Sequence, residues 1–257
     1  MISLAQIIEQ FDHKQAALVP SDWLQGRTVY GGLTASLAVE AVLQAGIENL
    51  PPLRSAYFSF VGPASPSITY RTRVLRAGKS VTSVEVECES DGGPALEAIM
   101  TFARGRQSAI RHDAATRAEV KRPEDCDPWP LQAAPNFLQN FDVRAAGGAV
   151  PFSGSEDPQL MAWVRHKDAR GVNPIVALIA MADCLPPAAT SLCHGRSPLS
   201  SITWMVDILG PVPDSEWFLF RSRTEQAGDG YSSEDMEIWT ESGQRLLWGR
   251  QTIAIFA

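Results

Sequence analysis

Residues 173–183 read Asn-Pro-Ile-Val-Ala-Leu-Ile-Ala-Met-Ala-Asp, and this stretch predicts the fold. Asn173 is a favourable N-cap residue, and Pro174 suits the first position of a helix. The stretch from Ile175 to Ala182 has no polar side, so a helix there must be buried on every side. A curved sheet wrapped around the helix would bury it in this way.

The flanking sequence predicts the strands of such a sheet. Val84, Val86 and Cys88 alternate with glutamates, which is typical of an antiparallel strand with one wet face. Met236 and Ile238 alternate with polar residues in the same way. Two further strands are each expected to have one largely apolar face, made by Ile202, Trp204, Val206 and Ile208 in one and by Leu247, Gln251, Ile253 and Ile255 in the other.

The chain also matches itself when it is shifted by about 150 residues, as expected for a duplicated unit. Aligned pairs are Val61-Gly62-Pro63 with Leu209-Gly210-Pro211, Tyr70 with Phe218, Arg73 with Arg221 and Gly78 with Gly228. In the first copy, residues 26–32 open a predicted helix over Leu33–Ala45. We therefore predict two similar halves, residues 1–108 and 136–257, joined by a linker over residues 109–135.

Composition narrows the class of protein. The 257 residues carry a net charge of −7, which argues against nucleic acid or an anionic membrane as a partner. The four cysteines form no C-x-x-C pair, and we expect free thiols in a reducing compartment. The N-terminus lacks the pattern of a secretory leader, so we expect a cytoplasmic protein. Basic residues of the linker, such as Arg111 and Lys121, are interpreted as solvated, with a ligand phosphate as the alternative.

Three segments in order resemble the bacterial acyl-CoA thioesterase II family. They are Gly26–Gly32, then Trp163-Val164-Arg165 with the stretch Ala180–Pro187, and the closing segment Ser242–Gln251. The resemblance covers nearly the whole chain apart from the linker. It implies an α+β double hotdog fold, in which each half wraps an antiparallel sheet around a central helix. It also implies hydrolysis of a fatty-acyl or related acyl-CoA without a metal or redox cofactor, with the acyl chain between the halves. We expect a homodimer of double hotdogs, because exposed strand edges favour association.

The resemblance also implies the catalytic residues, namely Asp183, Ser201 and Gln251. A carboxylate at the end of an apolar helix is costly to bury without partners, which suits a general base with a raised pKa. Gln251 lies on an otherwise apolar strand face, where its amide needs hydrogen-bond partners. The structural alternatives are a turn cap for Asp183, a sheet-edge amide for Gln251 and an ordinary strand serine for Ser201.

The middle position of this set is open between two residues. Ser201 keeps the spacing to Pro211, whereas the family more often has Thr, which Thr203 would supply two residues later. If the face containing Trp204 covers the helix, simple alternation makes Ser201 point away from it, unless the site lies where the two halves meet. We therefore keep Ser201 as catalytic and Thr203 as substrate-binding.

The first copy is expected to contribute differently. Gly31 and Gly32 precede its helix, where free N–H groups can bind an oxyanion or simply form a tight turn. We predict that both contact substrate. Glu40 corresponds to Asp183 and is interpreted as a structural remnant, and Thr101 is aligned with Gln251.

Other residues of the sequence bear on the alternative activities. Gly195-Arg196-Ser197-Pro198-Leu199 lacks the second glycine of a nucleophile elbow, which argues against an α/β-hydrolase. A hotdog hydratase or dehydratase commonly needs a histidine beside a carboxylate, and neither predicted helix contains one. A non-catalytic acyl-CoA-binding module remains the other alternative. Attack by water and attack by Asp183 itself to give an anhydride are both left open.

Overall fold

The computed structural model describes residues 1–130, 134–213 and 215–256. Residues 131–133 of the predicted linker, residue 214 and the last residue of the predicted C-terminal half lie outside the described residues.

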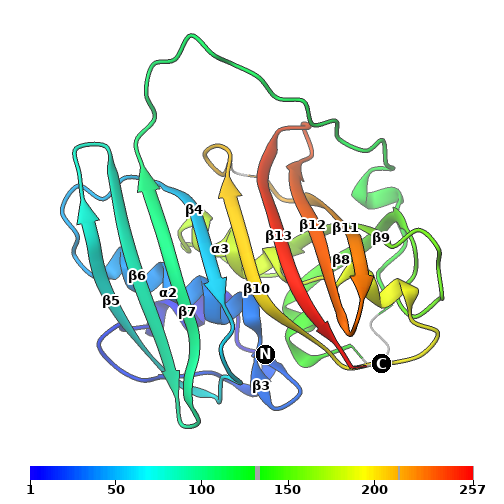
Figure 1. Cartoon of the computed structure of the whole chain (residues 1–257), viewed down its shortest axis with the longest axis horizontal. Helices are drawn as coiled ribbons and strands as arrows, with labels where there is room; N and C mark the ends of the chain where they lie inside the picture. The colour runs from blue at the N-terminus through cyan, green and yellow to red at the C-terminus, as the bar shows by residue number, and fades with distance from the viewer. Residues whose placement is uncertain (131–133, 214, 257) are drawn as a thin grey trace.

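One large antiparallel sheet forms the body of the molecule (Figure 1). Its strands lie in the order β1-β5-β6-β7-β4-β10-β13-β12-β11-β9-β8. In the N-terminal half they are β1 (Ala17–Leu18), β4 (Leu53–Ser59), β5 (Ser67–Ala77), β6 (Val81–Ser90) and β7 (Gly93–Ala103). In the C-terminal half they are β8 (Phe141–Gly148), β9 (Gln159–His166), β10 (Leu199–Ile208), β11 (Phe218–Gly228), β12 (Tyr231–Thr240) and β13 (Arg245–Ile255).

The two halves join where β4 pairs with β10, from Ser59 opposite Thr203 to Ser55 opposite Asp207. On each side of this junction the strands follow in equivalent order, β7-β6-β5 in one half and β13-β12-β11 in the other. The predicted duplication is therefore present as two sheets fused edge to edge. The predicted α+β double hotdog fold is confirmed.

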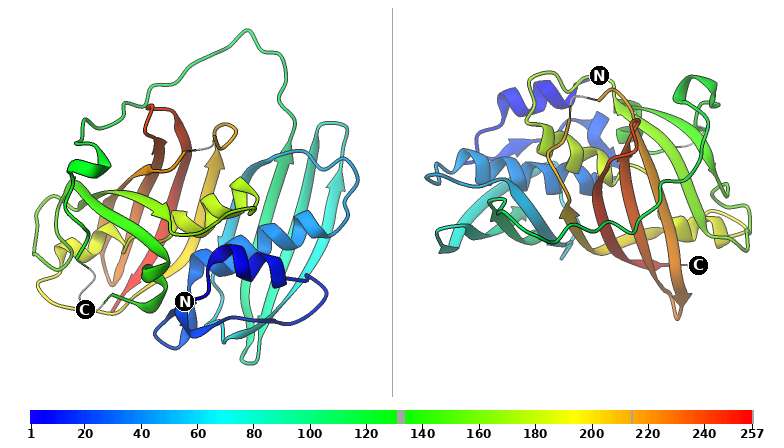
Figure 2. Two further views of the ribbon diagram at one scale, coloured as in Figure 1. Left: turned by 180° about the vertical axis from the view of Figure 1, so that it is seen from behind. Right: turned by 90° about the horizontal axis from the view of Figure 1, so that it is seen from above.

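The three α-helices of the described residues lie on one face of this sheet (Figure 2). They are α1 (Leu4–Gln10), α2 (Gly31–Gln44) and α3 (Pro174–Ala182). The Asn173 side chain caps α3 by accepting from the Ile175 N–H at 3.1 Å, as its sequence predicts. Most of α3 is buried, and α2 packs against it.

The central helices differ in length, with 14 residues in α2 and 9 in α3. Beyond α3 the chain passes through Pro186-Pro187 into the short helix η4 (Ala188–Leu192), which packs on β9, β11 and β12. The concave face of the second sheet is thus covered by α3 and η4 together. This arrangement leaves Asp183 at a break in the helical layer.

Short elements close the edges of the fold. They are the hairpin β2 (Leu24–Gln25) and β3 (Thr28–Val29) and the short helices η1 (Ser21–Trp23), η2 (Pro123–Asp125) and η3 (Asn136–Asn140). The second part of the predicted linker is packed, because the Trp129 N–H donates to the Val143 carbonyl oxygen at 2.9 Å. The Asn140 side chain, just before β8, donates to the Asp22 carbonyl oxygen at 3.0 Å, so η3 and η1 connect the two halves.

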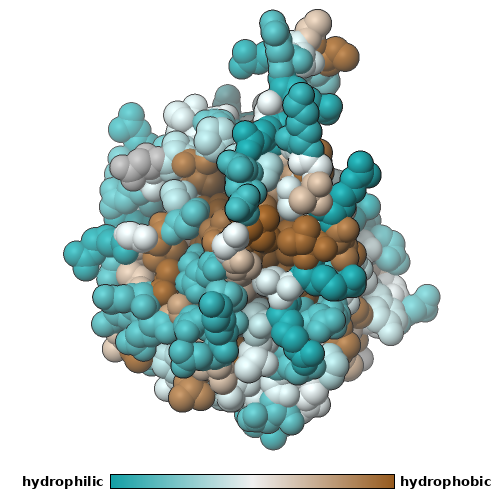
Figure 3. Space-filling model, turned by 90° about the vertical axis from the view of Figure 1, so that its left-hand side faces the viewer, coloured by the Kyte–Doolittle hydropathy of each residue, from teal (hydrophilic) through white to brown (hydrophobic). Residues whose placement is uncertain are grey.

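The side of the N-terminal half presents a band of hydrophobic residues between hydrophilic regions (Figure 3). At this side β1 pairs with β5 only at Ser67 and Ile68, and the rest of that edge has no partner strand among the described residues. Val74 and Leu75 of β5 are exposed. No helix in the described part of the chain is long and apolar enough to cross a membrane.

Candidate active site

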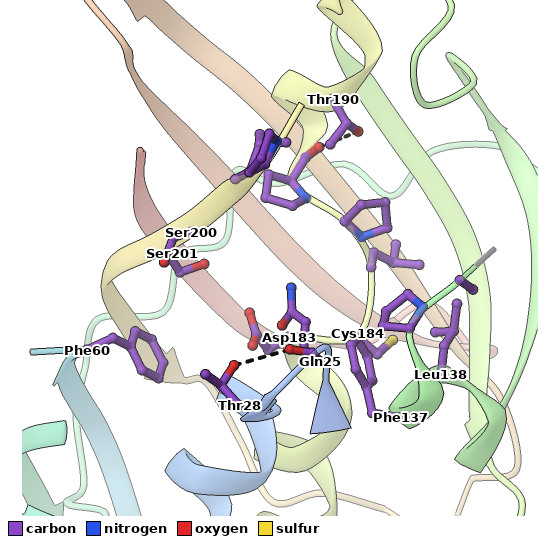
Figure 4. Close-up of a pocket in the computed structure, with 18 of the residues that line it drawn as sticks. Gln25, Thr28, Phe60, Phe137, Leu138, Asp183, Cys184, Thr190, Ser200 and Ser201 are labelled. Carbon is purple, nitrogen blue, oxygen red and sulfur yellow. Dashed lines mark hydrogen bonds between the residues drawn. The ribbon is translucent and has the colours of Figure 1, made fainter. Parts of the chain in front are cut away.

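A cavity of about 1060 Å³ opens where the two halves meet. This volume is just above the usual range for small-molecule sites, about 300–1,000 Å³. The N-terminal half contributes Thr28, Gly31, Thr34, Phe60 and neighbouring residues, whereas the C-terminal half contributes Phe137, Leu138, Phe152, Leu185, Pro186 and Ser201. Asp183 also lines this cavity and lies between Phe60 and Thr28 on one side and Phe137 and Leu138 on the other (Figure 4).

Asp183 is the residue at which α3 ends, and the start of α2 faces it. The Gln251 Nε2 donates to Asp183 Oδ1 at 2.8 Å, and the backbone N–H of Gly32 faces the carboxyl group. A Cβ atom on Gly31 would lie only 2.9 Å from Asp183 Oδ2. Glycine at this position is therefore what allows the first half to approach the carboxylate of the second.

The protonation of Asp183 is set by its surroundings. The side chain is partly exposed to the cavity, but protein atoms surround it. This burial raises the pKa of Asp183 from its usual 3.8 to about 6, while the hydrogen bond from Gln251 and the Gly32 N–H favour the ionised form and limit the rise. A carboxylate with such a pKa is ionised at neutral pH and is a stronger base than an ordinary aspartate.

Gln251 is oriented at both ends of its amide. Its side chain is 3% exposed. While Nε2 donates to Asp183, Oε1 accepts from the Ser201 Oγ at 3.2 Å. The amide cannot flip without losing the hydrogen bond to Asp183, because an ionised carboxylate only accepts and would then face Oε1. Three residues that are distant in the sequence thus form one hydrogen-bonded chain from Ser201 through Gln251 to Asp183.

Simple alternation along β10 would turn Ser201 away from the helix, but a β-bulge changes its direction. Ser201 pairs with Ile253 of β13, but Thr203 pairs with Thr252, so Ile202 is an extra residue in β10. The bulge places Ser201 on the same face as Trp204 and Gln251. Strict alternation along the strand could not predict this shift.

Thr203 and the two glycines occupy different places. Thr203 neighbours Thr252 and Ser59 on the opposite face of β10 and does not line the cavity. Gly31 lines the cavity, whereas Gly32 lies deeper, where a Cβ atom would be 2.8 Å from the Ala180 carbonyl oxygen. The structure therefore brings Asp183, Ser201, Gln251 and Gly31 together and leaves Thr203 outside this group.

The strand register shows which residues of the two copies correspond, and it differs from the correspondence expected from the sequence. Gln251 pairs with Glu234 across β12 and β13, and the equivalent pair across β6 and β7 is Val84 with Met100. Met100, rather than the expected Thr101, is therefore the counterpart of Gln251. Glu40 is half-buried, and its carboxylate accepts from Gln44 of the same helix at 2.9 Å.

Sequence reasoning missed Glu234, a second buried carboxyl group near Asp183. Its side chain is 3% exposed, and burial raises its pKa to about 8, with a smaller contribution from the negative charge of Asp183. Period-two counting backwards from Ile238 and Met236 places Glu234 on the apolar face of β12. A carboxylate on an otherwise apolar strand face is the sequence signal that could have identified Glu234.

Histidines are absent from the cavity. None of the four, all of which belong to the described part of the chain, lines it. His166 is buried against Phe141, and its ring Nε2 lies 2.8 Å from the Ala177 carbonyl oxygen. Burial lowers the pKa of His166 to about 4, so this ring is neutral at physiological pH.

Comparison with protein families identifies the class. The model of the acyl-CoA thioesterase N-terminal domain matches residues 19–103, and the model of the acyl-CoA thioesterase C-terminal domain matches residues 123–255. The chain belongs to this acyl-CoA thioesterase family. A search of curated proteins finds no match.

Solved structures share the fold over nearly the whole chain. A hotdog-fold protein of unknown function from Alicyclobacillus acidocaldarius has a TM-score of 0.86 at 21% identity, covering 94% of this chain and 92% of its own. A protein described as a putative thioesterase II from Thermobifida fusca has a TM-score of 0.80 at 21% identity, with 93% and 91% covered. An acyl-CoA thioesterase II from Mycobacterium marinum has a TM-score of 0.73 at 19% identity, with 93% and 91% covered.

Proposed function

We propose that this protein hydrolyses fatty-acyl or related acyl-CoA thioesters to the free acid and CoA, with Asp183, Gln251 and Ser201 as the catalytic residues. The observation that carries the proposal is the hydrogen-bonded chain of these three residues beside a large cavity. Membership of the acyl-CoA thioesterase family supports the same reaction.

In the proposed reaction, Asp183 acts as general base. Its carboxylate removes a proton from a water molecule as the water oxygen adds to the thioester carbonyl carbon. The tetrahedral intermediate then breaks the carbon–sulfur bond, and the CoA thiolate takes the proton back from Asp183. Gln251 and Ser201 hold the water and the carboxylate in the required geometry, because both are fixed by hydrogen bonds in the resting site.

The carbonyl oxygen is proposed to face the start of α2. Backbone N–H groups at a helix N-terminus have no partner within the helix and stabilise negative charge there. Gly31 lies at this end of α2 and lines the cavity, so the developing oxyanion would be polarised from the N-terminal half. The acyl chain would lie along the apolar wall that Phe137, Leu138 and Leu185 supply.

Attack by water is favoured here over attack by Asp183 itself. The Gln251 hydrogen bond and the Gly32 N–H hold the carboxylate, which opposes the movement that an attack on the thioester carbon needs. A single turnover in oxygen-18-labelled water tests this preference. Water attack puts the label into the product acid and none into the protein, whereas label found in Asp183 would show an anhydride opened at its Asp183 carbonyl and would contradict the preference.

The proposed activity is tested by release of free CoA thiol from a panel of short to long acyl-CoAs. We expect turnover by the wild type and its collapse in Asp183→Asn and Gln251→Ala. Turnover that survives both substitutions would contradict the site but keep the hydrolase. Binding of acyl-CoA without turnover at any chain length would favour the non-catalytic binding module.

We also propose a cytoplasmic homo-oligomer, a dimer of double hotdogs. The largely unpaired edge of β5 and its exposed residues Val74 and Leu75 support association. The unpaired state of all four cysteines supports a reducing compartment. Sedimentation equilibrium tests the assembly, since a mass of a single chain at micromolar concentration would contradict it.

A further inference from the structure

Glu234 is a buried acidic group near Asp183 that the proposed reaction does not use. It lies on β12, and its cross-strand neighbour on β13 is Gln251. The backbone N–H of Ala188, at the start of η4, donates to Glu234 Oε2 at 2.6 Å. A buried carboxyl group is costly unless its position serves the structure or the chemistry, so this contact calls for an explanation.

These contacts link the residues around the site into a closed loop. Asp183 is hydrogen-bonded to Gln251, Gln251 lies beside Glu234 in the sheet, and Glu234 accepts from Ala188. Ala188 is connected to Asp183 through the four residues 184–187, all of which line the cavity. Asp183 is the C-cap residue of α3, and the Cys184 N–H still donates to the Met181 carbonyl oxygen at 3.0 Å, but the α-helix does not continue through residues 185–187.

The two copies within the chain provide an internal comparison. The row of buried paired positions across β12 and β13 is Glu234 and Gln251, and the equivalent row across β6 and β7 is Val84 and Met100. An apolar row is therefore compatible with this architecture. The polar row accompanies the copy that contains Asp183, so Glu234 and Gln251 differ from the first copy together.

We propose that Glu234 is a positioning residue that ties the segment following Asp183 to the strand beside Gln251, and so fixes the distance between these two catalytic groups. The inference rests on the proposed function. Glu234 acts through its neighbours and does not contact the substrate.

The protonation state of Glu234 belongs to the same arrangement. The groups that face it are Gln251 from β13, Thr224 from β11, the Ala188 N–H from η4 and Asp183 from the end of α3, and the nearby charges of Asp183 and Asp235 are both negative. With its pKa at about 8, Glu234 is neutral when Asp183 is ionised at pH 7. Above that pKa a second negative charge would develop near Asp183 and oppose the forming oxyanion.

The test uses Glu234→Gln and Glu234→Ala in the full chain, with thiol release followed from about pH 5 to pH 10. Glu234→Gln keeps an acceptor for Ala188 but cannot ionise. We expect the wild type to lose kcat above about pH 8, and we expect Glu234→Gln to stay within about threefold of the wild type at pH 7 without that loss. We expect Glu234→Ala to lose kcat by about tenfold or more with a smaller change in KM, as misplacement of catalytic groups predicts.

Glu237→Gln is the matched control. Glu237 is on the opposite face of β12 and pairs with Arg221 and Arg245. This variant is expected to lower Tm without changing the pH profile, which separates a merely structural role from a positioning role.

Two results would overturn the inference while the hydrolase stands. One is a Glu234→Ala enzyme with kcat within about twofold of the wild type. The other is a Glu234→Gln enzyme that loses kcat at alkaline pH as the wild type does. This second result is sufficient by itself if Glu234→Ala fails to fold. A wild type that releases no thiol contradicts the proposed function itself, and the inference falls with it.

Discussion

Replacing Asp183 by Asn is expected to stabilise the protein while it abolishes turnover. The pKa of this carboxyl is about 6 in the folded chain against a usual 3.8, so the folded state binds the proton more tightly than the unfolded state does. Folding is therefore opposed as the pH rises from about 4 to about 6 and the group ionises. The difference corresponds to about 3 kcal/mol at pH 7.5 as an upper limit. Because the carboxylate partly faces the cavity, we expect about 2 kcal/mol.

The assay is urea unfolding of wild type and Asp183→Asn at pH 7.5 and at about pH 4. We expect the variant to gain about 2 kcal/mol, or about 4–8 °C in Tm, at pH 7.5. The advantage should shrink below about 1 kcal/mol at pH 4, where the wild-type carboxyl is protonated in the fold. Asp235→Asn is the control, since Asp235 pairs with Arg250 and should give no gain. The reasoning would be refuted if Asp183→Asn were no more stable than the wild type at pH 7.5, or if its gain in unfolding free energy were the same at both pH values.

Three predictions concern activity. The kcat/KM should fall about tenfold per pH unit below about pH 6, because the base Asp183 must be ionised; a profile flat to pH 4.5 would contradict its role. Gly31→Ala should lower kcat by about tenfold or more, because its Cβ would displace Asp183 Oδ2, whereas Gly105→Ala, with open space around it, should not. Ser201→Ala should lower kcat by about tenfold through loss of the Gln251 hydrogen bond, whereas Thr203→Ala should leave it unchanged; steady-state kinetics would reverse our choice if Thr203→Ala were the impaired variant.

The helix and strand patterns made the fold predictable from the sequence. The Asn173-Pro174 start and the wholly apolar stretch after it require a buried helix, and the alternating strands supply the sheet that covers it. Two details of the site depended on register instead. The bulge at Ile202 turns Ser201 inward, and the cross-strand pairing makes Met100 the counterpart of Gln251. Neither follows from period-two counting along a single strand.

Glu234 shows a different limit. Its place on the apolar face of β12 could be counted from the sequence, but its partner Ala188 belongs to η4, far away in the chain. The close approach of Gly31 to Asp183, which leaves too little room for a Cβ atom, is likewise made by two halves that meet only in the folded protein. Local patterns predict which residues face inward, whereas tertiary packing decides which of them meet.

The central claim is that only the second copy of the duplicated unit carries the catalytic carboxylate. The most direct test compares kcat/KM for thiol release by Asp183→Asn and by Glu40→Gln, the corresponding residues of the two copies, on one acyl-CoA. We predict a loss of about a hundredfold or more for Asp183→Asn and a change of less than about threefold for Glu40→Gln. Equal losses, or a larger loss for Glu40→Gln, would contradict the account.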